Sequence, residues 1–301
     1  MKTLIIGMSL FILITGCTTS SDEAEKVESI VHIHDLAFDR EQSDYLFVGT
    51  HHGLIEIDTD NGMSWQGEQQ ERHDFMGFTI TSDNTFVSSG HPDPESDLED
   101  PLGLMISEDR GESWHTGMLY GEVDFHLIEV NEANPNVIYG FDAYGQQVKR
   151  SQNGGESWET ATLEGINLNE FELYSIISDP SDGDVVVTGM RDGVYRSEDG
   201  GESFTQINSN LTMTSVDDNA DGHLIAHGVG EVEGLMISED MGETWESFGV
   251  LPSEDPVLSI AVSPTDENMI AVGTASDSIY LSEDQGTSWS PLVENGDPVD
   301  N

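Results

Sequence analysis

The 301-residue chain contains 59 Asp and Glu residues but only 9 Lys and Arg residues, so its formal net charge at pH 7 is −50. Such a charge repels phosphates and anionic lipid headgroups, which argues against nucleic acid or an anionic lipid surface as a partner. The acidic residues are scattered along the chain, a distribution that predicts adaptation to high salt, where self-repulsion is screened. The alternative of calcium storage needs carboxylates at the fixed spacing of an EF-hand loop, and the sequence contains no such loop.

The chain begins with a leader that resembles a lipoprotein signal. An apolar run over residues 4–14 is too short to span a membrane comfortably, and it is followed by Thr15, Gly16 and Cys17. Small residues before the only cysteine resemble the lipobox, which implies acylation of Cys17 and an anchor on the extracellular face of the cytoplasmic membrane. We therefore expect a signal peptide over residues 1–16 and a flexible polar tether over residues 17–29. An ordinary secretory signal with a coincidental cysteine is the alternative.

One pattern, Ser-x-Asp-x-Gly-x-x-Trp, occurs five times with small changes after a degenerate first copy. The central acid or amide residues of the six copies are Asp60, Asp109, Asn153, Asp199, Asp240 and Asp284. The copies start 41 to 49 residues apart, a period typical of four-stranded propeller blades. Asp or Asn binds nearby backbone N–H groups, Gly supplies a positive φ and the aromatic packs on a neighbour, so each copy predicts a hairpin turn. Such units must stack to bury their apolar faces.

Three apolar runs precede each copy of the pattern, which then makes the turn into a fourth strand. The expected first strands cover residues 32–38, 75–80, 125–130, 173–177, 212–216 and 258–262. No long helical period interrupts them, so we predict one all-β domain, a six-bladed β-propeller over residues 30–292 with an acidic tail over residues 293–301. Seven blades is the alternative if residues 27–33 and the tail complete another blade.

The repeated pattern resembles the Asp box of the bacterial-neuraminidase (BNR) repeat families, which include sialidases, the sortilin ectodomain and photosystem assembly-factor propellers. This resemblance covers residues 30–292 and implies the propeller fold. A closer resemblance is to small Gram-positive lipoproteins of the glycosyl-hydrolase-like BNR type. The shared strings are His-Ile-His, Thr-His-His-Gly-Leu, Met-Gly-Phe and Ser-Gly-His-Pro, at residues 32–34, 50–54, 76–78 and 89–92. The resemblance implies an extracytoplasmic lipoprotein and establishes no reaction.

Histidines gather on one predicted face of the propeller, where first strands begin and second strands end. Eight of the ten are placed there, namely His32, His34, His51, His52, His73, His91, His126 and His227. Converging imidazoles suit Zn, Cu or Ni. We predict a metal site from these histidines, His227 excepted, with Asp35, Asp74, Met76 and Asp124 as further ligands or as hydrogen-bond partners of the ligands. Met76 favours copper, whereas imidazoles and carboxylates alone favour zinc. A metal-free histidine-lined pocket and purely structural histidines are the alternatives.

The enzyme alternatives depend on arginines and carboxylates. A sialidase resemblance implies three arginines on the axial face, but only Arg72 and Arg191 are so placed, and the Phe-Arg-Ile-Pro string is absent. A neutral-sugar glycosidase or lyase needs two carboxylates. The candidates are Asp35, Asp74, Asp124, Asp142, Glu172 and Asp192. A third class, a protein-binding scaffold or assembly factor, needs only an exposed rim. The sequence therefore assigns no catalytic residue, and we expect a monomer that binds a small ligand, a metal ion or an extracellular protein.

Overall fold

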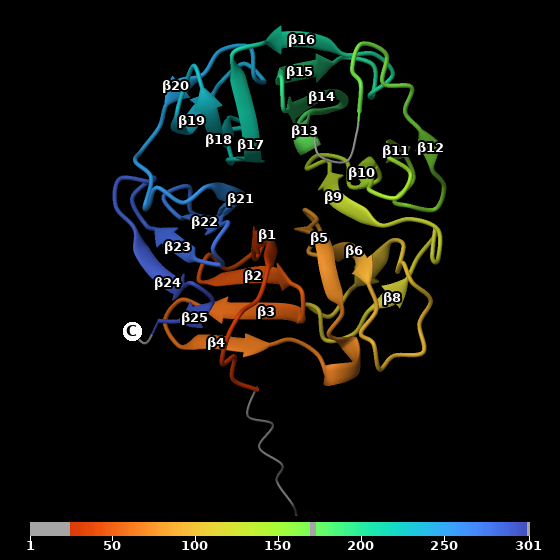
Figure 1. Ribbon diagram of the computed structural model, residues 1–301, viewed down its shortest axis with the longest axis vertical. Helices are drawn as coiled ribbons and strands as arrows, with labels where there is room; N and C mark the ends of the chain where they lie inside the picture. Colours follow the sequence, from red (N-terminus) through yellow and green to blue (C-terminus); the bar gives the residue numbers. More distant parts are fainter. Residues whose placement is uncertain (1–24, 169–172, 300–301) are drawn as a thin grey trace, which may run out of the picture.

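The computed structural model describes residues 25–168 and 173–299, and in them the chain forms six antiparallel sheets around a central axis (Figure 1). The prediction of an all-β, six-bladed propeller is confirmed. Within the described residues no helix is long and apolar enough to cross a membrane. Cys17 and Glu172 lie outside the described residues.

Each blade is a meander of consecutive strands whose first strand is the innermost. Blade 1 contains β1 (Ile33–Phe38), β2 (Tyr45–Thr50), β3 (Gly53–Asp58) and β4 (Gly62–Trp65). Blade 2 contains β5 (Asp74–Ile80), β6 (Phe86–His91), β7 (Met105–Ser107) and β8 (His115–Thr116). Blade 3 contains β9 (Phe125–Val130), β10 (Ile138–Asp142), β11 (Gln147–Ser151) and β12 (Glu159–Thr160). A short 3-10 helix, η1 (Gln69–Glu71), connects blades 1 and 2.

The second half of the chain repeats this meander. Blade 4 contains β13 (Leu173–Asp179), β14 (Asp182–Met190), β15 (Gly193–Ser197) and β16 (Thr205–Asn208). Blade 5 contains β17 (Leu211–Asp218), β18 (Leu224–Gly230), β19 (Gly234–Ser238) and β20 (Glu246–Ser247). Blade 6 contains β21 (Val257–Val262), β22 (Ile270–Thr274), β23 (Ile279–Ser282), β24 (Ser290–Glu294) and β25 (Asp297–Pro298).

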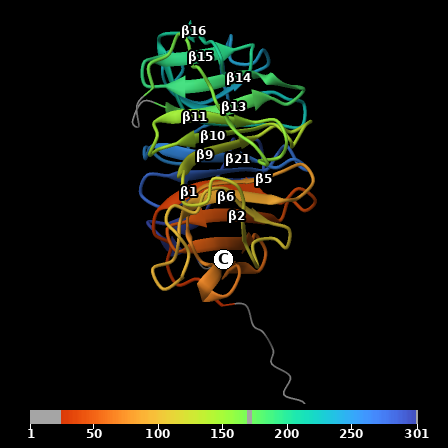
Figure 2. The same cartoon turned by 90° about the vertical axis from the view of Figure 1, so that its right-hand side faces the viewer.

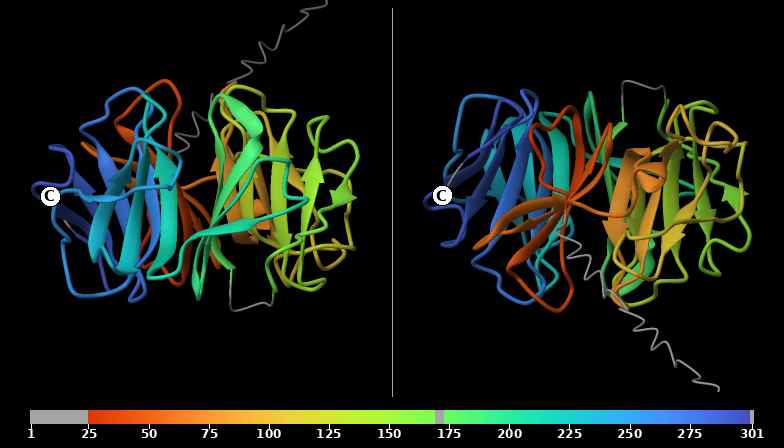
Figure 3. Two further views of the ribbon diagram at one scale, coloured as in Figure 1. Left: turned by 90° about the horizontal axis from the view of Figure 1, so that it is seen from above. Right: turned by 90° about the horizontal axis from the view of Figure 1, so that it is seen from below.

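The apolar core lies between blades, as the stacking argument requires. Each of six buried clusters joins the facing sides of two neighbouring blades, and together they close the ring. Between blades 1 and 2, for example, the ring centroids of Phe47 and Phe86 lie 4.7 Å apart at an interplanar angle of 75°. The side views show the blades as a stack of sheets (Figure 2; Figure 3). No blade buries its apolar faces alone, so the blades stabilise one another.

The ring closes where the two ends of the described chain meet. Lys26 forms a β-bridge to Ser64 of β4, and the backbone N–H of Ile30 donates to the carbonyl of Gly296 at 2.8 Å. Val27 is fully buried. The segment expected to be a tether is therefore packed on the propeller from Lys26 onward. Likewise, the segment expected to be a tail from residue 293 belongs to blade 6 through β24 and β25.

Five copies of the repeated pattern form one and the same hydrogen-bonded turn. In the copy of blade 2, Ser107 Oγ donates to Asp109 Oδ1 at 2.8 Å and accepts from the N–H of Gly111 at 2.9 Å, and the N–H of Ser113 donates to Asp109 Oδ1. The copies around Asn153, Asp199, Asp240 and Asp284 repeat these bonds.

The degenerate copy folds differently, and Asp60 does not take the role expected for it. In blade 1, Asp58 pairs with Gly62 across a tight hairpin, and Asp58 Oδ1 accepts the N–H groups of Asp60 and Asn61 at 3.0 Å each. The physical reason is that an acid stands where the other copies carry serine. The carboxylate of Asp58 then caps the turn by itself.

Candidate metal site

Every inner strand is interrupted by a β-bulge near its start. The register with the second strand skips one residue in each blade, and the skipped residues are His34, Met76, His126, Tyr174, Thr214 and Leu258. A bulge leaves one residue unpaired and re-aims its side chain. These six residues therefore occupy equivalent positions around the axis, on the face where inner strands begin, which we call the histidine face.

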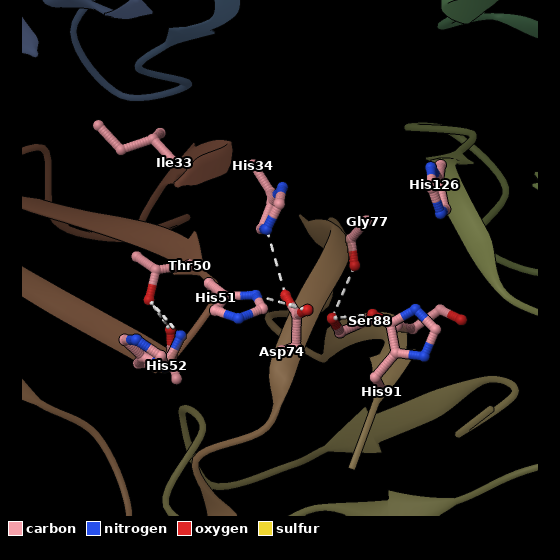
Figure 4. Close-up of polar contacts among 12 residues, drawn as sticks. Ile33, His34, Thr50, His51, His52, Asp74, Gly77, Ser88, His91 and His126 are labelled. Carbon is pink, nitrogen blue, oxygen red and sulfur yellow. Dashed lines mark hydrogen bonds and ion pairs between the residues drawn. The ribbon is translucent and has the colours of Figure 1, made fainter. Parts of the chain in front are cut away.

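The first cluster joins blades 1 and 2. His34 is the bulge residue of β1, His51 lies in the turn from β2 to β3, and Asp74 opens β5 (Figure 4). His34 Nε2 lies 3.1 Å from Asp74 Oδ1, and His51 Nδ1 lies 2.7 Å from Asp74 Oδ2. One ligand atom from each residue can be chosen so that all three lie within 4.8 Å of one another.

The second cluster joins blades 2 and 3. His91 ends β6, Asp124 directly precedes β9, and His126 is the bulge residue of β9. Asp124 Oδ2 lies 2.7 Å from His126 Nε2 and 3.4 Å from His91 Nε2, and the three ligand atoms again lie within 4.8 Å of one another. Unlike the first cluster, this one has an additional acid, because Asp100 Oδ1 lies 2.7 Å from His91 Nδ1.

The two clusters contain the same His–Asp pair, one blade apart. His51 and His91 follow the residues that pair with Ile33 and Phe75, the residues directly before the bulges. Asp74 and Asp124 each stand two residues before the bulge of the following blade. In both clusters the end of a second strand thus meets the start of the next blade. Only the third ligand differs, since His34 comes from the earlier blade and His126 from the later one.

The two clusters differ in how strongly their contacts shift the pKa values of their residues. Burial alone would raise the pKa of Asp124, but hydrogen bonds from His126 and His91 lower it to about 2. The hydrogen bond to Asp124 and a second to Asp100 outweigh burial and raise the pKa of His91 to about 9. At neutral pH the second cluster is therefore held together by a proton on His91.

In the first cluster, as in the second, one oxygen of the buried acid has no hydrogen-bond partner, Asp74 Oδ1 here and Asp124 Oδ1 there. Burial would raise the pKa of Asp74, and the contacts with His34 and His51 lower it instead. His34 Nε2 and Asp74 Oδ1 form an ion-pair contact at 3.1 Å, and neither buried atom has a further hydrogen-bond partner. A buried polar atom that lacks well-aligned partners costs free energy. The first cluster therefore brings two imidazoles and a carboxylate together around atoms that a bound cation would satisfy.

The other histidines predicted on this face, three of them as metal ligands, lie outside both clusters. The ring of His32 lies 5.6 Å from that of His51, and the ring of His52 lies 4.8 Å from it on the solvent side. His73 is buried, accepts the N–H of Asp93 at Nδ1, and has its pKa lowered by burial. His227 is also buried, with Nδ1 2.7 Å from Thr214 Oγ1.

Two further residues predicted near the site have other positions. Met76 is the bulge residue of blade 2, between the bulge histidines of blades 1 and 3. The carboxylate of Asp35 accepts the N–H of Leu36 at 2.9 Å, and burial raises its pKa to about 7. A backbone hydrogen bond from Phe78 of blade 2 opposes this rise in pKa, so Asp35 faces the neighbouring blade.

The carboxylates considered for a glycosidase are engaged elsewhere. Asp142 is buried and accepts from the N–H of Tyr144 and from Gln147 Nε2. Asp192 accepts from the hydroxyl of Tyr195. Asp74 and Asp124 belong to the two clusters. Each described candidate thus already has a hydrogen-bonding or ion-pairing role.

Sequence reasoning missed a cavity that adjoins the first cluster. It offers about 690 Å³ to solvent and is lined by Trp65, Arg72, Pro92 and Pro94 together with His51, Asp74 and His91. In the sequence, Trp65 reads only as the aromatic of the degenerate repeat. The one signal in the sequence that this copy differs is the acid Asp58 in place of the serine of the pattern.

Comparisons with known proteins bear on the fold. No family model matches the chain, and no curated protein matches it. Among solved structures, the GH74 enzyme of Niastella koreensis is similar with a TM-score of 0.62 and 16% identity over 89% of this chain and 46% of the enzyme. YCF48 bound to the D1 peptide gives a TM-score of 0.51 at 16% identity over 89% of this chain and 82% of YCF48.

A third similar structure is the extracellular domain of the one-component system BT4673 from B. thetaiotaomicron. Its TM-score is 0.55 at 15% identity, over 84% of this chain and 32% of that one. The chain spans less than half the length of the GH74 enzyme and of the BT4673 domain. These proteins are an enzyme, a peptide-bound protein and the extracellular domain of a one-component system, so the likeness shows the propeller fold and leaves the chemistry to the site.

Proposed function

We propose that this protein is an extracytoplasmic propeller that binds a divalent transition metal ion, zinc by its donor set, at the first cluster and more weakly at the second. The observation that carries the proposal is the first cluster itself. Two imidazoles and one carboxylate from adjacent blades converge within 4.8 Å, and the buried atoms His34 Nε2 and Asp74 Oδ1 have no hydrogen-bond partner beyond their own contact at 3.1 Å. Two histidines and a carboxylate form a zinc ligand set that leaves a coordination position open for water or a ligand.

The second cluster also has one buried acid oxygen without a hydrogen-bond partner, Asp124 Oδ1, but we expect it to bind metal less tightly because its other contacts must be displaced first. Asp124 accepts from two histidines, and the ion must compete with the proton on His91. Copper is the alternative ion, and it would draw on the thioether of Met76 as a further donor.

A zinc titration by calorimetry, together with elemental analysis after dialysis, tests this proposal. The double variant His34→Ala/His51→Ala should lose about a hundredfold or more in zinc affinity, because it removes two of three ligands. The control is His115→Ala/His223→Ala, which removes two histidines away from both clusters and should bind zinc as the parent does. Absence of bound metal in the purified parent, combined with no zinc or copper uptake, would contradict the proposal.

The glycoside hydrolase alternative draws on the likeness to GH74 propellers, which is a likeness of fold at 16% identity. It requires a carboxyl group free to protonate a leaving group. The engagement of Asp35, Asp142 and Asp192 in other contacts favours the metal-binding proposal. If the protein hydrolysed a neutral oligosaccharide and this activity persisted after removal of metal, the glycoside hydrolase alternative would replace the metal-binding proposal.

We place the protein outside the cytoplasmic membrane, held by lipid on Cys17. The support is the short apolar leader that ends at Gly16 and Cys17, and the resemblance to glycosyl-hydrolase-like BNR lipoproteins. Replacing Cys17 by Ala should release the protein from the membrane fraction. If the variant were distributed between membrane and medium as the parent is, the proposed lipid anchor on Cys17 would be wrong.

A further inference from the structure

We propose that the cavity beside the first cluster binds a small organic acid, one with an apolar body, a carboxylate and a second donor such as a hydroxyl or amino group. This inference rests on the proposed metal site, and it names the class of ligand which that site would hold. It is carried by the size of the cavity, its walls and the position of Arg72.

The cavity has the dimensions of a small-molecule site. Its volume of about 690 Å³ lies within the range of roughly 300–1,000 Å³ that is usual for ligand pockets. It is also where the two clusters approach each other. Asp74 of the first cluster and His91 of the second are directly paired across β5 and β6, and both line the cavity. A ligand here would therefore lie beside the metal ligands of both clusters.

The lining of the cavity combines polar side chains, among them His52, Gln69 and Asp93, with an apolar and stiff part. Trp65 closes one side, and Pro92 and Pro94 belong to the insertion after β6. An indole ring and two pyrrolidine rings offer contact area with little conformational entropy to lose on binding. This lining favours a ligand with an apolar body.

Arg72 supplies a positive charge at this position. Its guanidinium lies over the Trp65 ring, 5.2 Å from the centroid, and only 13% of its side chain is exposed. The chain has only 9 lysines and arginines against 59 acids, so a cation inside a cavity is unusual for this surface. Arg72 Nε is buried and has no hydrogen-bond partner. A guanidinium binds a carboxylate through two parallel N–H donors.

One carboxylate of the chain already contacts Arg72, through a single N–H donor. Arg72 Nη2 donates to Glu25 Oε2 at 2.8 Å, and the side chain of Glu25 is 66% exposed. An exposed ion pair contributes little free energy. The carboxylate of a ligand could therefore replace Glu25 at Arg72, while its second donor takes the open coordination position of the metal. Neutral molecules of the same shape would lack the first of these contacts.

Calorimetry with 3-phenyllactate tests the inference, because this probe carries a ring, a carboxylate and a hydroxyl. The zinc-loaded parent should bind it at least tenfold more tightly than it binds 3-phenyllactamide, which has no charge. Arg72→Gln should weaken 3-phenyllactate binding about tenfold and leave zinc affinity unchanged, since Arg72 is not a metal ligand. Arg191→Gln is the matched control, because Arg191 lies on the same face in blade 4 and should have no effect.

The two proposals fail separately. A protein that binds zinc through His34 and His51 but does not bind 3-phenyllactate, or binds the acid and the amide equally, overturns this inference and leaves the metal site intact. A protein that takes up no zinc loses the proposed function. In that case, binding of 3-phenyllactate that depends on Arg72 would still support the proposed acid site. If 3-phenyllactate did not bind either, both proposals would be wrong.

Discussion

Blades 1 to 3 and blades 4 to 6 share a backbone but differ in chemistry at the histidine face. The bulge residues of the first three blades are His34, Met76 and His126, and those of the last three are Tyr174, Thr214 and Leu258. All six bulges stand at one position of the repeat, so the bulge is a property of the fold. The side chains of the proposed metal site occur in only half of it, which agrees with the general finding that function lies in sites carried by a fold.

The difference can be traced residue by residue. Tyr174, Arg191 and Thr212 occupy in blades 4 and 5 the positions that His34, His51 and Asp74 occupy in blades 1 and 2. Their backbone supports the same approach, since Thr212 Oγ1 donates to the carbonyl of Arg191 at 3.2 Å. If the fold supplies the geometry, the three side chains alone should be enough to make a site.

The largest expected effect is therefore a gain of metal binding. The triple variant Tyr174→His/Arg191→His/Thr212→Asp should bind one zinc ion more per chain than the parent, because it repeats the donor set of the first cluster on an equivalent backbone. Elemental analysis after dialysis and calorimetry measure the stoichiometry. The matched control keeps both histidines and replaces Thr212 by Asn, which lacks the charge. An unchanged stoichiometry in a correctly folded triple variant would show that the two halves differ in backbone geometry as well.

Below the histidine face, the two halves resemble each other again. Glu129 of blade 3 and Asp217 of blade 5 stand three residues after their bulges, and each accepts a backbone N–H of the next blade, from Ser178 at 3.0 Å and from Val262 at 2.7 Å. Both line a narrow central channel with about 130 Å³ of space for solvent. Burial raises the pKa of Glu129 to about 7 and also raises the pKa of Asp217.

The contact of Glu129 with blade 4 predicts an effect of intermediate size, on the stability of the protein and on how that stability depends on pH. A raised pKa in the folded state means that the folded protein binds more protons than the unfolded chain, so stability falls as pH rises from about 4.5 to about 7. Glu129→Gln keeps an acceptor for Ser178 without the buried charge. Near pH 8 it should stabilise the protein by about 2 kcal/mol, and near pH 4 it should change little.

Thermal or urea unfolding of parent and variant at both pH values measures this difference. Arg40 and Asp217 also act on Glu129, the first lowering its pKa and the second raising it, so both should be kept unchanged. A variant that is less stable than the parent at pH 8 would mean that the charge of Glu129 supports the fold.

The sequence predicted the fold well because the fold depends on repeated local chemistry. The copies around Asp109 and Asp240 specify a turn through short-range hydrogen bonds, and their spacing specifies the blade. The sequence also predicted that most histidines lie on one face of the propeller. The direction of each strand tells which of its ends lies on that face, so no further information is needed for this prediction.

The sequence could not select which histidines meet. The contacts of Asp74 and Asp124 with histidines depend on the bulges of the inner strands. No residue type in the sequence predicts where these bulges occur. His73 and His227 were grouped with the others, yet burial and single hydrogen bonds engage them elsewhere. In a chain with so many acids, Glu129 gave no signal in the sequence, because its role depends on a contact with the next blade.

The smallest expected effect is on the opposite face, where blades 2 to 6 carry the hydrogen-bonded turn and blade 1 does not. Asp240 Oδ1 accepts the N–H of Thr244 at 2.8 Å and Oδ2 accepts its hydroxyl at 2.6 Å, whereas in the described chain Asp60 contributes only its backbone N–H to the turn. Asp240→Ala should therefore destabilise the protein by about 1 kcal/mol, and Asp60→Ala should stay within about 0.5 kcal/mol of the parent. Urea unfolding of the two variants side by side measures the difference. Equal losses would mean that the degenerate copy stabilises blade 1 as much as the complete copy stabilises blade 5, and that the serine of the pattern is not what makes the turn.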